Sequence, residues 1–210
     1  MDIRHDCFQP RLDTRNADRL SLFRPILITG NDKAGLCLAR DLSPKGLKAR
    51  TYLDLDLDER VRVHFSTESV VSGWVEWRDD KMLGVHFEEA VNMREVMTHF
   101  SAVPRPGQAN RSPRLPIRCR AALSLAGRTA MVEVQDISQR GVKIQASLLQ
   151  PGEEVELQLD GLERRKAVVR WIQTGIAGLT FVRALSFDEL ARWAAQQEPP
   201  SLLTLRSGQP

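Results

Sequence analysis

Two short segments of this sequence carry residue types that can bind a charged ligand, and the two are copies of each other. Residues 41–46 read DLSPKG and residues 136–141 read DISQRG, so an Asp, a Ser and a Gly recur at an offset of 95. Arg19 and Arg114, which precede the two aspartates, are related by the same offset. A guanidinium can form two parallel hydrogen bonds with a phosphate, whereas a carboxylate only accepts hydrogen bonds. These groups suit a small anionic ligand.

The sequence that follows each copy also repeats, which indicates a tandem duplication. VEW at 75–77 and GVHF at 84–87 return as VRW at 169–171 and GLTF at 178–181, at an offset of 94. Self-similarity at a fixed period is typical of one structural unit that occurs more than once, so we expect two units of about 95 residues.

A segment rich in proline, glycine and polar residues separates the two units and is typical of a linker. We expect the first unit to span residues 11–102, the linker 103–110 and the second unit 111–198. Residues 199–210 then form a tail.

The pattern of each unit predicts a small antiparallel β-barrel followed by a helix. VRVHF at 61–65 and VELQL at 155–159 alternate apolar with polar residues, which is typical of a half-buried strand. Helical patterns follow at 88–100 and at 190–197, where a capping box at 186–189 opens the second one. We therefore expect a mainly β fold of two tandem six-stranded antiparallel barrels, each followed by a short C-terminal α-helix. The strands expected in the first unit are 24–29, 34–39, 46–49, 60–65, 70–78 and 82–87.

Composition narrows the classes of partner. The 30 basic and 27 acidic residues are interspersed and leave a net charge of +3, which does not favour binding of a nucleic-acid polymer. The three cysteines have no metal-ligand spacing, so we expect reduced thiols and no metal site. The sequence shows no apolar run of the roughly 20 residues that a membrane span needs. We expect a cytoplasmic protein without a membrane span.

The first copy of the motif is complete when the approach to the barrel is included. Arg15 stands four positions before Arg19, so an RxxxR pair precedes the DxSxxG turn. The order, spacing and duplication of these motifs resemble the PilZ domain, a bacterial receptor module for cyclic di-GMP, over nearly the whole chain. The resemblance implies a nucleotide site made of Arg15, Arg19, Asp41, Ser43 and Gly46, with cyclic di-GMP as a ligand and no further cofactor.

Physical reasons support these residue types. Guanidinium groups bind phosphate oxygens or the O6 and N7 acceptors of guanine, and they stack on its ring. Asp41 can accept the N–H donors of a guanine edge or hold an arginine in place. Ser43 can bind its own turn or the ligand. Gly46 permits a positive φ or a close approach of the ligand to the backbone.

The second copy departs from the pattern. When Arg114 is matched to Arg19, the position that corresponds to Arg15 holds Asn110, although Arg111 is adjacent. The candidate residues of the second site are Arg111, Arg114, Arg118, Asp136, Ser138 and Gly141.

A second register between the copies is open. Arg114 and Arg118 form another RxxxR pair, in which Arg118 is nearer to Asp136 along the chain. Arg24 would then be the counterpart of Arg118 in the first copy. We favour the register that matches Arg114 to Arg19, because the spacing from arginine to aspartate is then the same in both copies.

These observations favour a cyclic di-GMP receptor that signals to an unidentified protein partner, either by ordering its arginine segment or by reorienting its two barrels. We expect the first copy to bind in preference to the second. The alternative is an interaction scaffold that has lost nucleotide binding in one or both copies. We do not expect an enzyme, because the sequence shows no nucleophile paired with a base, no P-loop and no paired carboxylates.

Other conspicuous residues have structural interpretations. Asp and Ser side chains of a turn often bind only the backbone of that turn. We expect Trp77 and Trp171 to pack in the cores rather than to stack on a ligand, because both recur beside strand valines. We expect His64 and His86 to be exposed. The alternating aspartates of 54–58 lack the spacing of a calcium loop and predict an exposed acidic loop.

Overall fold

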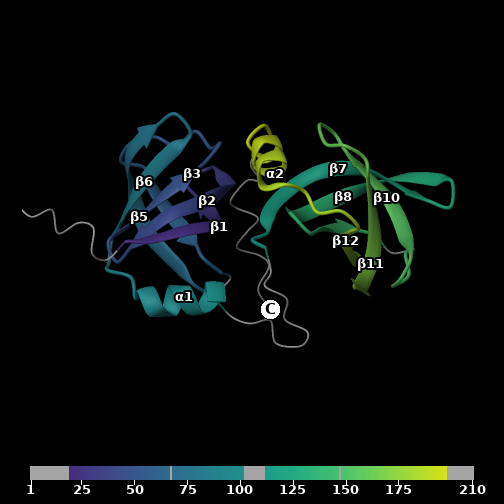
Figure 1. Cartoon of the computed structure of the whole chain (residues 1–210). Helices are drawn as coiled ribbons and strands as arrows, with labels where there is room; N and C mark the ends of the chain where they lie inside the picture. The colour runs from purple at the N-terminus through teal and green to yellow at the C-terminus, as the bar shows by residue number, and fades with distance from the viewer. Residues whose placement is uncertain (1–18, 67, 102–111, 147, 198–210) are drawn as a thin grey trace, which may run out of the picture.

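The computed structural model describes residues 19–66, 68–101, 112–146 and 148–197, and these form two closed β-barrels, each followed by one helix (Figure 1). Each barrel has six antiparallel strands, which confirms the predicted fold class. The first barrel has the strand order β1-β2-β3-β6-β5-β4, and β4 pairs with β1 to close it. Its strands are β1 (Leu20–Thr29), β2 (Ala34–Ser43), β3 (Gly46–Arg50), β4 (Arg60–His64), β5 (Val70–Asp79) and β6 (Met82–Phe87).

The second barrel repeats this topology strand for strand. Its order is β7-β8-β9-β12-β11-β10, and β10 pairs with β7 to close it. Its strands are β7 (Leu115–Leu125), β8 (Arg128–Ser138), β9 (Gly141–Gln145), β10 (Glu154–Leu159), β11 (Arg165–Gln173) and β12 (Ile176–Phe181).

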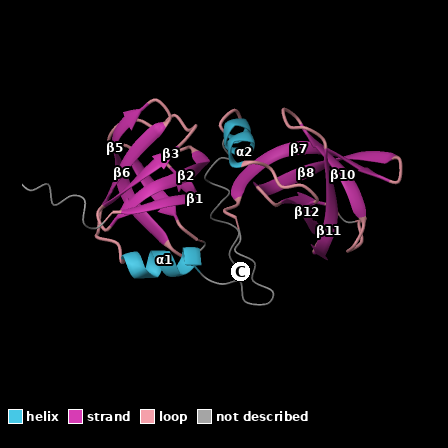
Figure 2. Ribbon diagram, viewed as in Figure 1, coloured by secondary structure: helices cyan, strands magenta, loops and turns pink. Residues whose placement is uncertain are grey.

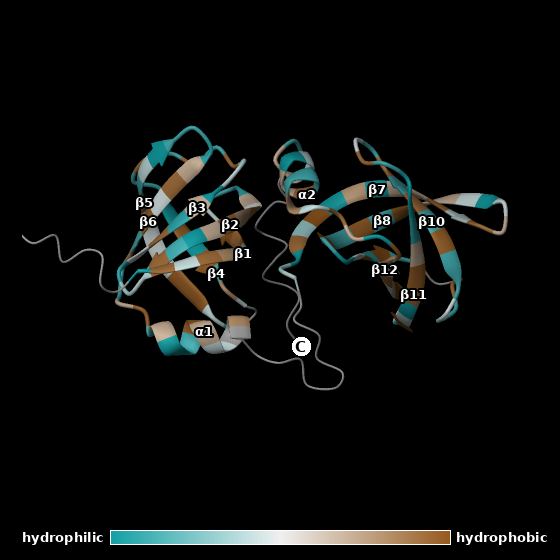
Figure 3. Cartoon of the chain, viewed as in Figure 1, coloured by the Kyte–Doolittle hydropathy of each residue, from teal (hydrophilic) through white to brown (hydrophobic). Residues whose placement is uncertain are grey.

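Alternating hydrophobicity builds the two cores. In β4, Val61 and Val63 are buried whereas Arg60 and Arg62 are exposed, as the period-two pattern predicts. Hydrophobic segments alternate with hydrophilic ones along the strands of both barrels (Figure 3). Each barrel therefore encloses its own set of apolar side chains.

Tight turns connect several of the paired strands. Thr174 and Gly175 join β11 to β12 with φ values of 51° and 76°, and Gln173 pairs with Ile176 across the turn. Two consecutive residues with positive φ form the type I′ turn, whose twist matches that of a hairpin. A tight type I′ turn therefore joins β11 to β12.

The first helix, α1 (Met93–Ser101), begins later than the pattern predicted. The side-chain oxygen of Asn92 accepts a hydrogen bond from the Arg94 amide at 3.1 Å, which defines the start of the helix. Val96 and Phe100 are buried in the core of the first barrel, where the Phe65 and Phe100 rings pack edge to face with centroids 5.8 Å apart. The helix α1 thus covers its own barrel.

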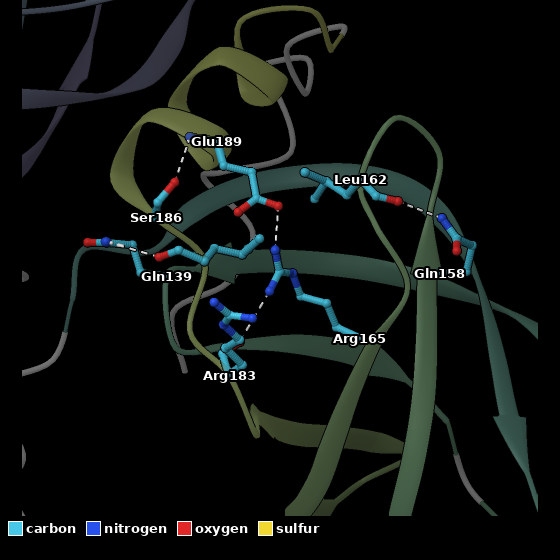
Figure 4. A network of polar contacts seen from close by, with 8 residues as sticks. Gln139, Gln158, Leu162, Arg165, Arg183, Ser186 and Glu189 are labelled. Carbon is cyan, nitrogen blue, oxygen red and sulfur yellow. Dashed lines mark hydrogen bonds and ion pairs between the residues drawn. The ribbon is translucent and has the colours of Figure 1, made fainter.

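The second helix, α2 (Phe187–Ala194), has a side-chain cap at its start and is joined to the second barrel by an ion pair (Figure 4). Ser186 is the N-cap and accepts a hydrogen bond from the Glu189 amide, so the predicted capping position is confirmed, although the helix ends earlier than 197. Arg165 of β11 binds the carboxylate of Glu189. Trp193 is buried and donates its indole N–H to the Asp160 carbonyl at 2.7 Å.

The helix α2 also lies against the first barrel, between the two units (Figure 2). Asp188 forms an ion pair with Arg50 and accepts a hydrogen bond from the Tyr52 hydroxyl at 3.0 Å. Leu27 and Leu36 of the first barrel belong to the same buried cluster as the second core. The cluster joins the two barrels through apolar contacts as well as charge.

The cysteines and histidines of the described residues differ in burial. Cys37 and Cys119 are free, and burial raises the pKa of Cys37 to about 12, whereas Cys7 lies outside the described residues. The prediction for His64 is wrong, because this ring is half-buried with Nε2 3.1 Å from the Thr29 hydroxyl. His86 is exposed as predicted.

Within the described parts of the chain, no group of His, Cys, Asp and Glu side chains is arranged to hold a metal ion. No helix among those residues is long and apolar enough to cross a membrane.

Candidate functional site

The repeated DxSxxG segment is almost entirely strand. Asp41 and Ser43 lie in β2 and Gly46 begins β3, so only two residues form the turn, and Ser43 pairs with Gly46. The Ser43 hydroxyl donates a hydrogen bond to the Gly46 carbonyl at 3.2 Å. Ser138 donates to the Gly141 carbonyl at the same distance in the second copy. In both copies the serine closes its own turn, which is one of the two roles open from the sequence.

The two glycines are required by the neighbouring strand. Neither has a positive φ, so of the two roles considered for Gly46 the left-handed backbone does not apply. A Cβ on Gly46 would lie 2.7 Å from the carbonyl oxygen of Val85, and one on Gly141 would lie 2.2 Å from that of Leu179. The glycines therefore permit close approach between strands of the barrel.

Strand pairing places the two arginines in equivalent positions. Asp41 pairs with Ser21, and Asp136 pairs with Pro116, so Arg19 and Arg114 each stand two positions before the partner of the aspartate. This equivalence favours the register that matches Arg114 to Arg19. The predicted site residues Arg15 and Arg111 lie outside the described residues.

Arg118 does not occupy the position equivalent to Arg19. It is an exposed residue in the irregular part of β7 between Pro116 and Cys119, and at an offset of 95 its counterpart is Phe23. Arg24, the other alternative, lies on β1 and is also exposed.

The aspartates of the two copies have different partners. The Ser21 hydroxyl donates a hydrogen bond to Oδ1 of Asp41 at 2.9 Å. In the second copy a proline takes the place of that serine, and Arg114 forms an ion pair with Asp136. The Asp136 side chain is 20% exposed and the Arg114 side chain 42%, so the pair remains open to solvent.

A line of side chains crosses four strands of the first barrel beside this aspartate. Asp41 of β2 pairs with Lys48 of β3, which pairs with Gly84 of β6, which pairs with Trp77 of β5. Directly paired residues share a face of the sheet, so these positions all point the same way. The Lys48 ammonium lies 5.8 Å from the centre of the Trp77 ring.

The second barrel has the same line at the equivalent strand positions. Asp136 pairs with Lys143, Lys143 with Gly178, and Gly178 with Trp171. We call the Asp, Lys and Trp of each line the cross-strand row: Asp41, Lys48 and Trp77 in the first barrel, and Asp136, Lys143 and Trp171 in the second.

The prediction that both tryptophans lie in the cores is wrong. Trp77 is 36% exposed and Trp171 is 40% exposed, and each ring covers a glycine, Gly84 or Gly178, on the next strand. A β-bulge separates Val75 from Trp77, so the two residues face opposite sides although they are two positions apart. The bulge turns the ring outward.

Bulges also aim the aspartates. Ala39 is buried in the first core, and strict alternation would place Asp41 inside as well. A register shift between Ala39 and Asp41 turns the carboxylate outward, and the same shift occurs between Val134 and Asp136. β-Bulges commonly redirect side chains beside functional sites.

The lysines were not among the residues singled out from the sequence. Lys48 and Lys143 both stand two positions after the motif glycine, at an offset of 95, so the duplication itself carried the signal. Their pairing with the aspartates and tryptophans depends on strand register.

The second row lies close to the contact between the barrels. A mostly apolar cavity of about 310 Å³ is lined by Tyr52 and Leu53 of the first unit and by residues 115–117 of the second. Pro116, which faces Asp136 across the strands, is therefore part of the wall between the units.

Comparison with known proteins identifies the family. The model of the PilZ domain family matches residues 13–100 and again residues 108–196. No curated protein sequence matches the chain significantly.

Solved structures that match this chain have low sequence identity to it. The PlzA protein of Borreliella burgdorferi, solved in complex with c-di-GMP, is 10% identical over 83% of this chain and 88% of that one, with a TM-score of 0.40. The Bacillus subtilis inhibitor of motility MotI is 13% identical over 90% of this chain and 100% of that one, with a TM-score of 0.33. YcgR of Escherichia coli in complex with c-di-GMP is 14% identical over 81% and 82%, with a TM-score of 0.33.

The two family matches coincide with the two barrels and their helices, and together they cover most of the sequence. The chain therefore belongs to the PilZ domain family and carries two PilZ domains in tandem.

Proposed function

We propose that this protein is a cytoplasmic receptor for cyclic di-GMP. The observation that carries the proposal is the cross-strand row, which recurs in both barrels beside an arginine on the approach to the first strand. Membership of the PilZ family supports the choice of ligand.

The residues of the first row match the chemistry of this ligand. Arg19 and Lys48 supply positive charge for the phosphates, with Arg15 as a further arginine on the same segment. The Asp41 carboxylate accepts hydrogen bonds from the N–H edge of a guanine. The exposed face of Trp77 offers a surface on which a base can stack.

We propose that the first copy binds in preference to the second. Among the residues that the structure describes, Asp41 receives only a hydroxyl hydrogen bond from Ser21, whereas Asp136 has a guanidinium partner in Arg114. A ligand at the second site has to compete with that ion pair. The second copy also has Asn110 where the first has Arg15.

Binding at the second site offers a route for the signal. Residues 115–117 follow Arg114 directly and line the cavity against the first barrel. If a ligand draws Arg114 away from Asp136, the start of β7 moves where the barrels touch. We propose that the protein signals to a protein partner by such reorientation, or by ordering of its arginine segment around the ligand.

A second candidate function is a scaffold that binds a protein partner without the nucleotide. The Arg114–Asp136 ion pair favours this role for the second copy, because the pair satisfies both charges without a ligand. The first copy would keep the receptor function.

Isothermal titration calorimetry of the whole chain with cyclic di-GMP tests the proposal. We expect binding in the wild type and its loss from the first site when Arg15→Ala and Arg19→Ala are combined. A matched control combines Arg94→Ala with Arg128→Ala, which removes two exposed arginines outside the cross-strand rows. Binding by the arginine variant equal to that of the wild type would exclude the first site.

Calorimetry of the wild type also distinguishes the receptor function from the scaffold function. No heat and no competition at high ligand concentration would leave only the scaffold function for both copies. Chromatography of the incubated ligand tests for turnover, and any product would overturn the assignment as a receptor.

A further inference from the structure

An exposed aromatic ring lies beside the first site and has no counterpart in the second. Phe23 of β1 is 67% exposed, although burial of a phenylalanine is normally favourable. At an offset of 95, the second copy has Arg118 in its place. The strand irregularities are the same in both copies, so the difference concerns the side chain alone.

A guanidinium covers this ring. The Cζ atom of Arg40 lies 4.1 Å from the centre of the Phe23 ring, within the range of a cation–π contact. The second copy has Gln135 at the position of Arg40, so it lacks both members of the pair. Stacking on Phe23 restricts the guanidinium before any ligand arrives, which lowers the entropy that binding must remove.

Both residues lie where the strands are irregular, next to the aspartate of the row. Phe23 is in the irregular part of β1 between Ser21 and Arg24, and Arg40 is in the bulge between Ala39 and Asp41. Arg40 therefore adjoins Asp41 in sequence, and Ser21, which binds the Asp41 carboxylate, stands two positions before Phe23. The pair forms one edge of the first site.

We propose that Phe23 and Arg40 form a stacking platform for a guanine ring of the ligand at the first site. The inference rests on the proposed function. A phenyl ring with a guanidinium on its face presents a flat, positively charged surface, and such surfaces bind nucleobases by stacking. Asp41 beside the platform accepts hydrogen bonds from the edge of a base, so face and edge are recognised together. The second copy, with Arg118 and Gln135, lacks this platform.

Substitutions at Phe23 separate the aromatic face from bulk and from hydrophobicity. Phe23→Leu keeps an apolar side chain without a ring, and Phe23→Tyr keeps the ring. We expect Phe23→Leu to weaken cyclic di-GMP binding at the first site by about tenfold or more, as for loss of one stacked base. We expect Phe23→Tyr to stay within about threefold of the wild type, a change of less than about 1 kcal/mol.

Arg40→Gln introduces the residue of the second copy and should also weaken binding. Met131→Ala is the matched control, because Met131 is 63% exposed on the second barrel and its loss should leave binding unchanged. Calorimetry of each full-length variant gives both affinity and stoichiometry. Asp41→Asn in the same series reports whether the first site itself binds.

The outcomes distinguish the platform from the receptor. If Asp41→Asn abolishes binding at the first site while Phe23→Leu binds as the wild type does, the platform is wrong and the receptor stands. If the wild type binds no cyclic di-GMP, both proposals fall. Should Phe23→Leu fail to fold, nuclear Overhauser effects between guanine H8 and the Phe23 ring of the wild type decide, and their absence with bound ligand overturns the platform.

Discussion

The two barrels share one backbone arrangement, but different residues surround the Asp, Lys and Trp of their cross-strand rows. Each has the same strand order, the same bulges and the same cross-strand row. In the first barrel, Asp41 is bound by Ser21 and follows Arg40, whose guanidinium lies over the Phe23 ring. In the second, Asp136 is paired with Arg114 and lies beside the contact between the units. The comparison indicates that geometry alone does not make two equivalent sites.

The two helices also differ, because one packs on a single barrel and the other contacts both. The helix α1 buries Val96 and Phe100 in its own barrel. The helix α2 contributes Leu190 and Trp193 to a cluster that includes residues of both barrels. The second unit thus contacts the first barrel through α2 and through the start of β7. The contact includes Leu27 near the end of β1, whereas Asp41 of the first cross-strand row pairs with Ser21 near the start of that strand.

The largest expected effect is a loss of stability when the motif glycine of either barrel is replaced. The two replacements together test whether both barrels depend equally on this glycine. Because a Cβ on Gly141 would meet a backbone carbonyl at 2.2 Å and one on Gly46 at 2.7 Å, both changes to Ala should destabilise the protein. Overpacking typically costs about 1–3 kcal/mol, and we expect Gly141→Ala at or above the top of that range and Gly46→Ala lower within it. Denaturant unfolding, with hydrogen exchange to assign the barrel, measures both.

Gly127→Ala is the control for this pair. Gly127 has a φ of 77° and no atom within 4 Å of an added Cβ, so its change introduces backbone strain of about 1 kcal/mol without a clash. A cost for Gly141→Ala no larger than that of Gly127→Ala would mean that the strands can separate, and the common frame would be less rigid than described.

The next effect concerns binding. Asp41→Asn replaces an acceptor by a group that also donates, so we expect a loss of cyclic di-GMP affinity of about tenfold to a hundredfold, the range of a hydrogen bond to a charged group. Asp136→Asn should change the first-site affinity little, because its row lies on the other barrel. Equal losses in the two variants by calorimetry would show that the copies bind as one unit, and the asymmetry would be abandoned.

The β-bulges limit how much of the fold and of the candidate site could be predicted from the sequence. The duplication predicted both barrels and the match of Arg114 to Arg19, because turn and strand residues recur together. The tryptophans were expected in the cores because they recur beside strand valines, but the bulge between Val75 and Trp77 turns the ring outward. The bulged positions carry no distinctive residue type. The row was not predictable, because its aspartate, lysine and tryptophan meet only through the pairing of four strands.

A smaller effect is expected from acid at the contact between the barrels. Burial raises the pKa of Asp188, but the hydrogen bonds from Arg50 and Tyr52 and the charges of Arg50 and Arg192 outweigh it, so the pKa lies below its ordinary value of 3.8. A carboxyl group with a lowered pKa stabilises the docked state above its ordinary pKa and loses that contribution as the pH falls through the lowered value. We therefore expect the contribution of Asp188 to docking to be constant from pH 7 to about pH 5 and to weaken below about pH 4.

Distances between spin labels on the two barrels would follow this transition. Asp188→Asn removes the titrating group, so its docking should be weaker at pH 7 and should change less below pH 4. An Asp188→Asn protein whose acid response matches that of the wild type would assign the response to other carboxylates.

The smallest expected effect tests whether a ligand can displace Arg114 from Asp136 or whether this ion pair is a structural part of the contact between the barrels. Arg114→Gln removes the ion pair with Asp136, and because both side chains are open to solvent we expect a loss of stability of less than about 1 kcal/mol. Ser21→Ala, which removes the corresponding hydrogen bond from Asp41, should cost a similar amount and serves as the match in the first copy. Thermal unfolding of the two variants measures both changes. A small loss of stability in Arg114→Gln means that a nucleotide can displace the arginine at a small cost in free energy. The two copies would then differ only in their affinity for the ligand. A cost well above that of Ser21→Ala would make the pair a structural element of the contact between the barrels, and the second copy would then act as a scaffold.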